Sequence, residues 1–362
     1  MSHRPPDSPM KGRGASTNRS SRFDAWTRTA EPEDELHDAS EFAPGPLRTE
    51  VSEDPARSII SRNESPDIPF EQSINPFKGC EHGCIYCYAR PTHAYLGLSA
   101  GLDFETKLFY KANAAQLLAG ELSKSGYRPS PVALGGTTDP YQPIEKRLQV
   151  TRSLLRVLSE YHHPLTIITK SALVERDLDI LTPMAKLGLV RIYFSITTLD
   201  QEIARLMEPR ASAPARRLEA MRRVTAAGVP SGILVAPVIP ALTDKDIEGV
   251  LEAAAAAGAS DAGYVLLRLP REVRDLFVEW LEQHYPLRAG HVMSLLQQMR
   301  DGKDNDSEFG TRMRGTGLFA DLIRRRFESA ARRLGLNLKR SSLDCSLFRV
   351  PAPTTGQLQL DL

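Results

Sequence analysis

Three of the chain's four cysteines lie within one short segment, GCEHGCIYC. Cys80, Cys84 and Cys87 follow the spacing C-x3-C-x2-C, whereas Cys345 is remote in the sequence. Where thiols are kept reduced, clustered cysteines indicate metal ligands or catalytic groups rather than disulfides. A metal group held by three thiolates keeps one coordination position open.

Three interpretations compete for this segment. Structural zinc sites usually combine two pairs of ligands, and no second pair follows here, although His82 and His93 are near in sequence. Buried core cysteines are common, yet the surrounding glycines, histidine and glutamate are typical of a loop, and loops more often carry function. A [4Fe–4S] cluster takes thiolate ligands from such short loops. The sequence favours the cluster, whose open iron is free to bind a substrate or cofactor.

The elements that must position these cysteines form a β/α alternation. Short apolar or β-branched runs predict buried strands, and the stretches between them predict amphipathic helices that end at glycines such as Gly188 and Gly228. The strands are predicted at about 73–78, 131–135, 165–169, 190–197, 232–238 and 263–268. This alternation indicates parallel strands with right-handed crossovers. We therefore expect an α/β fold, a partial (β/α)6 TIM-like barrel, with an open doubly wound sheet as the alternative.

The chain divides into four predicted regions. Residues 1–65 are rich in Pro, Ser and charged side chains, and such a segment buries too little apolar surface to fold. We expect a disordered tail there, followed by the β/α core over residues 66–270. Residues 271–350 carry long helical patterns and are expected to form a helical extension, and residues 351–362 are expected to be a loose tail.

The composition limits the classes of protein to which this chain can belong. The net charge is +1, so the whole molecule presents no strong attraction to polyanions, although a local basic patch is compatible with it. The sequence contains no run of about 18 apolar residues, so it predicts no membrane span. The basic N-terminus lacks the apolar stretch of a secretory signal. We therefore expect a cytoplasmic protein without a membrane partner.

The cysteine segment resembles the signature of the radical S-adenosylmethionine (SAM) enzymes, C-x3-C-x-aromatic-C, with Tyr86 as the aromatic residue. It follows the first predicted strand, where that family carries it. The resemblance implies a [4Fe–4S] cluster on Cys80, Cys84 and Cys87 whose open iron chelates SAM. In that family the reduced cluster cleaves SAM to methionine and a 5′-deoxyadenosyl radical, which abstracts hydrogen from the substrate. An electron donor such as flavodoxin or ferredoxin is the implied partner.

Within the superfamily the chain resembles the spore photolyase-like, or DNA repair photolyase, branch, through the motifs GCxxxCxYCYAR, TDPYQPIE, ITKS, EPRAS and PVIPALTD. Spore photolyase itself has a further cysteine after the second strand, which returns a hydrogen atom to the product radical. The corresponding stretch GGTTDPYQPIE contains none. Only the radical initiation chemistry is therefore expected to carry over, with Cys345 either folding back to replace that cysteine or serving as a buried structural residue.

The resemblance also implies contacts with SAM at the ends of the second and third strands. Gly135, Gly136 and Thr137 follow the second strand, where the family holds the amino group of SAM; a simple β/α turn is the alternative. Lys170 ends the third strand in ITKS. Its ammonium group is expected to pair with the carboxylate of SAM, and a surface lysine is the alternative.

Further contacts are implied on the fourth and fifth strands. Ser195 is a polar residue in an apolar strand, which indicates a hydrogen bond into a pocket, to the ribose or carboxylate of SAM. Ala236 and the backbone of Tyr86 are expected beside the adenine. Asp139 either faces the same site or caps a turn, and Arg210 either binds an anion or pairs with Glu208.

The sequence says less about the substrate than about the cofactors. The stretch 310–340 is strongly basic, with most of its arginines on one predicted helix. Such a stripe is suited to a phosphate backbone, whereas a solvated helix face is the alternative. Nucleic acid is therefore a candidate partner. The alternative function is a zinc-stabilised nucleic-acid-binding module without catalysis.

Overall fold

The computed structural model describes residues 11–19, 22–23, 47–338 and 342–352. Its main sheet has the strand order β10-β9-β8-β7-β6-β3-β2, and every neighbouring pair is parallel except β2 and β3. These strands are β2 Ile60–Arg62, β3 Gln72–Ile74, β6 Val132–Leu134, β7 Leu165–Thr169, β8 Val190–Ser195, β9 Ser231–Val238 and β10 Asp261–Leu266. Six parallel strands in chain order confirm the predicted partial (β/α)6 barrel.

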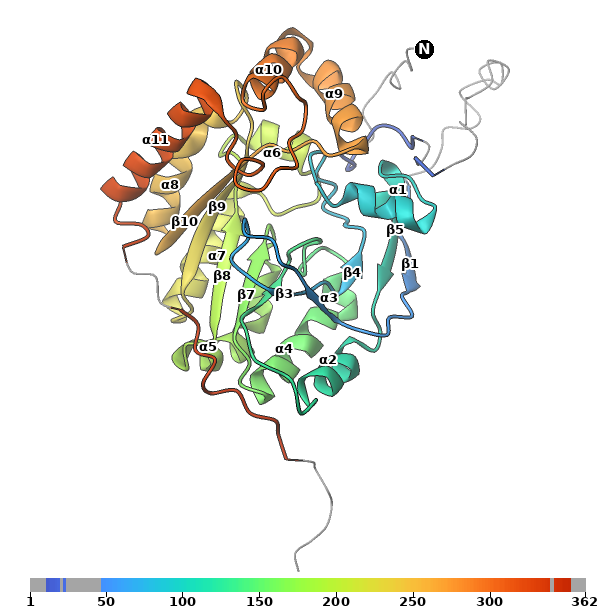
Figure 1. The fold of residues 1–362 in the computed structure, drawn as a ribbon, viewed down its shortest axis with the longest axis vertical. Helices are drawn as coiled ribbons and strands as arrows, with labels where there is room; N and C mark the ends of the chain where they lie inside the picture. The colour runs from blue at the N-terminus through green and yellow to red at the C-terminus, as the bar shows by residue number, and fades with distance from the viewer. Residues whose placement is uncertain (1–10, 20–21, 24–46, 339–341, 353–362) are drawn as a thin grey trace, which may run out of the picture.

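Helices connect the strands and cover the outer side of the sheet (Figure 1). In β7 and β8 buried side chains alternate with half-buried ones, as expected for strands covered by helices on one face. The connecting helices are α1 Leu102–Thr106, α2 Ala114–Leu122, α3 Glu145–Leu148, α4 Val150–Glu160, α5 Leu178–Lys186, α6 Gln201–Met207, α7 Pro214–Ala226 and α8 Ile247–Ala256. Because parallel strands share one carboxyl end, the loops that follow them converge there.

The predicted helical extension follows β10. Its helices are α9 Glu272–His284, α10 Pro286–Gln298 and α11 Gly317–Arg333. The indole of Trp280 on α9 donates a hydrogen bond to the carbonyl of Leu206 on α6 at 3.2 Å. Helix α11 lies against α8 (Figure 1). Of the predicted C-terminal tail, only residues 351 and 352 belong to the described part of the chain.

The first predicted strand, 73–78, is divided in two. β3 ends at Ile74, and Phe77 and Lys78 form a separate strand, β4. Pro76 lies between them and has no N–H with which to continue a ladder. β4 joins a small second sheet of order β1-β5-β4, with β1 Glu50–Glu53 and β5 Lys107–Tyr110. The two sheets meet at the start of the cysteine segment.

The prediction of a disordered tail over residues 1–65 is wrong for several of its residues. β1 pairs in parallel with β5, and β2 pairs antiparallel with β3. Ile59 is 1% exposed. Residues 11–19 also pack on the barrel, as described below. The prediction failed because β1 and β2 are held by backbone hydrogen bonds to β5 and β3. A strand held in this way needs few apolar side chains of its own. Residues 1–10, 20–21 and 24–46 lie outside the described residues.

In the part of the chain that the structure describes, no helix combines the length and the apolarity needed to cross a bilayer.

Candidate functional site

The three clustered cysteines lie in the loop that follows β4. Cys80 and Cys84 are buried, Cys87 is half-buried, and all three are free thiols. Burial raises the pKa of each thiol, and at Cys80 the nearby Asp139 and the other two cysteines raise it further. Buried thiolates therefore require a positively charged partner, which a metal cluster supplies.

The donor set of this loop fits an iron–sulfur cluster. Over the described residues, no three His, Cys, Asp or Glu side chains already stand in metal-binding geometry. The fit rests instead on donor chemistry: three thiols share one loop, at a spacing that suits thiolate ligation of a cluster. Among the residues that the structure describes, no second pair of ligands completes a tetrahedral zinc site with them.

Two glycines shape the loop. Gly79 and Gly83 have φ angles of 78° and 67°, a region that side chains with a Cβ rarely adopt. A Cβ on Gly79 would lie 2.9 Å from the carbonyl oxygen of Phe104, and one on Gly83 would lie 2.8 Å from Oε2 of Glu105. Both glycines therefore allow the loop to fold tightly around Cys80.

A buried arginine holds the loop from behind. Arg90 has no exposed surface and donates to the carbonyls of Cys84 at 2.9 Å and Gly83 at 3.1 Å. Its guanidinium also pairs with the carboxylate of Glu105, which is buried as well. Five donors in a fixed plane allow one arginine to fix several loop carbonyls at once. Arg90 and Glu105 therefore position the cysteine loop.

Residues 11–19, called the strap below, close over the outer side of this loop. The backbone N–H groups of Gly14 and Ala15 donate to the carboxylate of Glu105 at 3.0 and 2.9 Å, and Arg13 donates to its carbonyl at 2.9 Å. A Cβ on Gly14 would overlap the carbonyl oxygen of Gly83. The strap thus contacts the cysteine loop directly and satisfies the carboxylate that positions it.

The far half of the strap is anchored on α9. The hydroxyl of Ser16 donates to Gln283 at 2.7 Å, and that of Thr17 donates to Glu279 at 3.0 Å. The strap therefore bridges the cysteine loop and the helical extension.

The predicted SAM contacts of three strands come together at the carboxyl end of the sheet. Nζ of Lys170, after β7, donates to the hydroxyl of Ser195 at 2.8 Å and to the carbonyl of Ala236 at 3.2 Å. The Ser195 hydroxyl donates to the same carbonyl at 3.1 Å. An ammonium, a hydroxyl and a carbonyl therefore lie together at the ends of β7, β8 and β9.

Glu208 links this group to the cysteine loop. Its carboxylate pairs with Lys170 at 3.2 Å, accepts from Thr197 at 2.9 Å, and bonds to the hydroxyl of Tyr86. It also pairs with Arg217 on α7, which is 1% exposed. Burial alone would raise the pKa of the Glu208 carboxyl, but Arg217 and Lys170 hold it well below its usual range. The carboxylate is therefore ionised in a buried position.

The predicted residues after β6 have separate partners. Gly135 has φ 92°, and a Cβ there would overlap the carbonyl oxygen of Ile168 on β7. The carbonyl of Gly136 accepts from the hydroxyl of Tyr88, directly after Cys87. The N–H of Thr137 donates to Asn75 at 3.0 Å. This turn therefore lies beside both β7 and the cysteine loop.

Asp139 joins the loop after β6 to the cysteine loop. Its carboxylate accepts from the N–H groups of Tyr141 at 2.8 Å, as a turn cap does, and of Lys170 at 2.7 Å. His82 lies 3.4 Å away. Although burial opposes the effect, His82 and these N–H groups lower the pKa of the Asp139 carboxyl.

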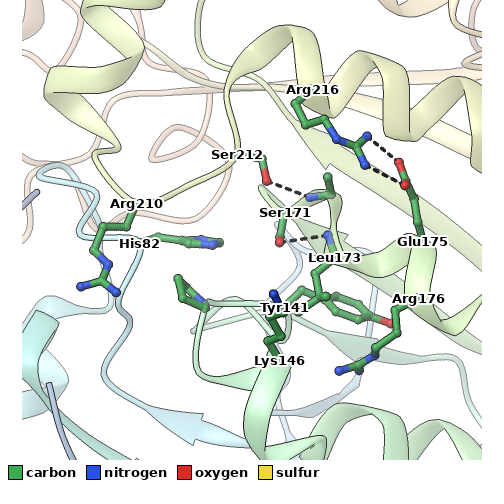
Figure 2. A pocket seen from close by; sticks show the side chains of 12 residues that line it. His82, Tyr141, Lys146, Ser171, Leu173, Glu175, Arg176, Arg210, Ser212 and Arg216 are labelled. Carbon is green, nitrogen blue, oxygen red and sulfur yellow. Dashed lines mark hydrogen bonds and ion pairs between the residues drawn. The ribbon is translucent and has the colours of Figure 1, made fainter.

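A cavity of about 460 Å³ borders the cysteine loop from outside, with His82 and Arg210 on one wall (Figure 2). The alternative pairing of Arg210 with Glu208 is wrong, because Arg210 pairs with Glu81 at 3.1 Å. Arg216 pairs with Glu175 at 2.6 Å. The cavity brings the cysteine loop within reach of the molecular surface.

Cys345 lies at the opposite end of the sheet. The N–H of Asp344 donates to the carbonyl of Gly188, just before β8, and that of Arg349 donates to Tyr161, before β7. Cys345 therefore does not reach the carboxyl ends of the strands.

The fold and this site together place the chain in a family. The sequence model of the radical SAM superfamily matches residues 74–254, which is half of the chain. The chain belongs to the radical SAM superfamily.

The chain is also similar to individual proteins. An uncharacterized protein of Mycobacterium tuberculosis is 37% identical over 221 residues, which cover 60% of this chain and 65% of the relative. One of Methanocaldococcus jannaschii is 26% identical over 214 residues, covering 59% and 76%. The match thus spans less than two thirds of the mycobacterial relative. A structure of spore photoproduct lyase complexed with dinucleoside spore photoproduct has a TM-score of 0.56 at 19% identity, covering 79% of this chain and 80% of the lyase. That likeness shows a shared fold.

Several residues of the site escaped sequence reasoning. Arg90 closes the motif GCxxxCxYCYAR, but the motif alone did not show that it holds the loop carbonyls, and Glu105 lay in no motif. The strap lay in a segment of polar composition. Arg217 was hidden among the arginines of a basic helix. The available signal was the pair of glycines in KGRGAS, because Gly14 meets the cysteine loop where only glycine fits.

Proposed function

We propose that this protein is a radical SAM enzyme whose Cys80, Cys84 and Cys87 hold a [4Fe–4S] cluster. The observation that carries the proposal is the chain of contacts from Tyr86, inside the cysteine segment, through Glu208 to Lys170 at the strand ends. When bound and reduced, the cluster supplies the electron that cleaves SAM to methionine and a 5′-deoxyadenosyl radical, which abstracts hydrogen from the substrate.

The residues at the strand ends would bind and orient SAM. The Lys170 ammonium and the Ser195 hydroxyl are the donors for its carboxylate, and the turn at Gly135, Gly136 and Thr137 offers close approach for its amino group. The backbone of Ala236 and Tyr86 would border the adenine. The barrel wall limits the access of water, which protects a radical from side reactions.

An electron donor, such as a flavodoxin or a ferredoxin, completes the proposed reaction. The cavity lined by His82 and Arg210 supports this part of the proposal, because it brings the cysteine loop within reach of a docked protein (Figure 2).

The test is metal and product analysis of protein purified without oxygen. The expected protein is brown, contains iron and sulfide, and releases 5′-deoxyadenosine from SAM when reduced. Replacing Cys80, Cys84 or Cys87 by Ala should abolish both the cluster and the cleavage, whereas Cys345→Ala should retain both. A colourless protein that holds one zinc ion and cleaves no SAM would instead establish the zinc-stabilised binding module.

A further inference from the structure

Residues 138–142, TDPYQ, form a largely buried turn after β6, which is called the clamp below. Tyr141 and Gln142 have no exposed surface. The N–H of Gln142 donates to the carbonyl of Asp139 at 3.4 Å, and the hydroxyl of Tyr141 donates to Asp177 at 3.1 Å. The clamp is therefore held in one conformation by bonds within itself and to the protein beneath it.

One side of the clamp holds Cys80, a proposed ligand of the cluster. The side-chain amide of Gln142 donates to the carbonyl of Gly79 at 3.1 Å and accepts from the N–H of Glu81 at 2.8 Å. These two backbone groups flank Cys80, so one amide fixes the chain on both sides of the cysteine. Because the amide is buried, breaking either bond would leave polar groups without partners. Cys80 therefore keeps a fixed position relative to the clamp.

The other side of the clamp holds Lys170, the proposed donor to the carboxylate of SAM. The Asp139 carboxylate accepts from the hydroxyl of Thr169 at 2.8 Å and from the N–H of Lys170 at 2.7 Å. The ring of His82, in the cysteine loop, lies 3.4 Å from the same carboxylate. Asp139 therefore fixes the backbone from which the Lys170 ammonium projects, and it connects that backbone to the cysteine loop.

Asp139 also acts on Cys80 through its charge. Burial is the main cause that raises the pKa of the Cys80 thiol, and the charge of Asp139 is the next, whereas a hydrogen bond from the backbone of Asp139 opposes them. The carboxylate is thus close enough to influence a group bound to this sulfur. Because reduction of a cluster adds an electron, a negative charge beside it makes its reduction potential more negative.

Glu208 links the same two segments in a different way. Its carboxylate bonds to Tyr86 and pairs with the ammonium of Lys170 at 3.2 Å. A SAM carboxylate would bind to that same ammonium, whereas the clamp is bonded to the backbone of Lys170 and shares no group with the ligand. The clamp is therefore the link that SAM binding leaves unchanged.

We propose that Asp139 and Gln142 are positioning residues, which hold Cys80 and Lys170 at a fixed separation and thereby orient SAM on the open iron of the cluster. The inference rests on the proposed function, in which SAM is held at two points, by the iron and by the Lys170 ammonium. Two such contacts form together at low cost only when their spacing matches the ligand before it binds. The clamp keeps this spacing through bonds made within the protein.

The test is a titration of the reduced, cluster-containing protein with SAM, measured by the change that SAM causes in the electron paramagnetic resonance signal of the cluster. Gln142→Met keeps the length of the side chain and loses both amide bonds, so the half-saturating SAM concentration should rise by about tenfold or more. Gln72→Met, which removes another buried amide, on β3, is the matched control and should respond like the wild type. Iron content and circular dichroism show whether each variant is folded and holds its cluster.

Asp139→Asn separates positioning from a purely structural role, because it keeps the size of the side chain and removes its charge. Its half-saturating SAM concentration should rise by about threefold or more. The reduction potential of its cluster, from a redox titration followed by the same signal, should be more positive than in the wild type. Asp261→Asn, at the buried start of β10, is the control and should change neither value.

A wild-type SAM response in Gln142→Met that holds its cluster would overturn the inference. If Gln142→Met loses its cluster, Asp139→Asn decides, and a wild-type SAM response in that variant would overturn the inference as well. The proposed function fails separately, because wild-type protein without iron, or without a SAM-dependent change in its signal, contradicts it before any variant is compared.

Discussion

Lys170 and Glu208 form an ion pair across the carboxyl end of the sheet, with Nζ 3.2 Å from Oε1. The lysine is also held by Ser195 at 2.8 Å, and the glutamate is also held by Arg217. The ammonium is thus placed before any ligand arrives, and a carboxylate that binds there adds to an arrangement already fixed by β7, β8 and α7. Such preorganisation lowers the ordering cost of binding.

Lys170→Met should weaken SAM binding by about 10- to 100-fold, because a charge-assisted hydrogen bond contributes about 1.5–3 kcal/mol. Equilibrium dialysis with SAM and cluster-containing protein measures this affinity. Lys146→Met, on the exposed side of α3, is the matched lysine control and should bind like the wild type. Unchanged affinity in Lys170→Met would remove Lys170 from the SAM site.

Glu208→Gln should lower the free energy of unfolding by about 3–5 kcal/mol, because Arg217 is then a buried charge without its partner. Urea unfolding followed by circular dichroism measures the change. Glu328→Gln, in an exposed pair with Arg324, is the control and should leave the unfolding midpoint unchanged. If both variants unfold at the wild-type midpoint, the buried pair has no structural role.

Gly14→Val should loosen the strap, because its side chain would overlap the carbonyl of Gly83 and displace the two N–H groups that bind Glu105. We expect the reconstituted cluster to bleach several-fold faster in air than in the wild type, with the same far-ultraviolet circular dichroism. The loss of the cluster is measured by the decrease of its visible absorbance. Gly126→Ala meets no atom within 4 Å and is the control. Identical bleaching in both variants would show that the strap gives no protection.

His163 should make the protein sensitive to mild acid. The ring has no exposed surface, and burial lowers its pKa from 6.5 to about 4. The unfolded chain takes up this proton below pH 6.5 while the folded protein does not. The contribution to stability is therefore complete above pH 6.5 and is lost progressively as the pH falls to about 4, by up to about 3 kcal/mol.

Urea midpoints between pH 7 and pH 4.5 test this prediction. His163→Leu should show a shallower fall than the wild type, whatever its stability at pH 7, and His291→Gln, an exposed histidine, should follow the wild-type curve. A wild-type slope in His163→Leu would assign the acid sensitivity to other groups.

The periodic parts of the fold were predictable from sequence. The positions of buried strands such as β7 and β8 could be predicted from their β-branched runs. The order of the strands follows from the rules for parallel crossovers. The cysteine spacing is local, so Cys80, Cys84 and Cys87 could be chosen without a structure. Lys170 and Ser195 could be placed because each ends a strand, and strand ends converge.

The remaining site residues depend on contacts between distant segments. Glu208 meets Lys170 only because α6 and β7 end at the same side of the sheet, and Arg217 is distinguished from its arginine neighbours only by facing inward. The strap was misread because its composition is that of a solvated tail, while its stability comes from acceptors on other segments.

The strap is synthesised long before the helix that anchors it. Ser16 precedes its partner Gln283 by 267 residues. At ribosomal rates of about 5–20 residues per second, this separation corresponds to tens of seconds. Within that interval the cysteine loop is made well before the helix that anchors its cover. The order of synthesis therefore leaves the cysteine loop without its anchored strap until α9 has been made.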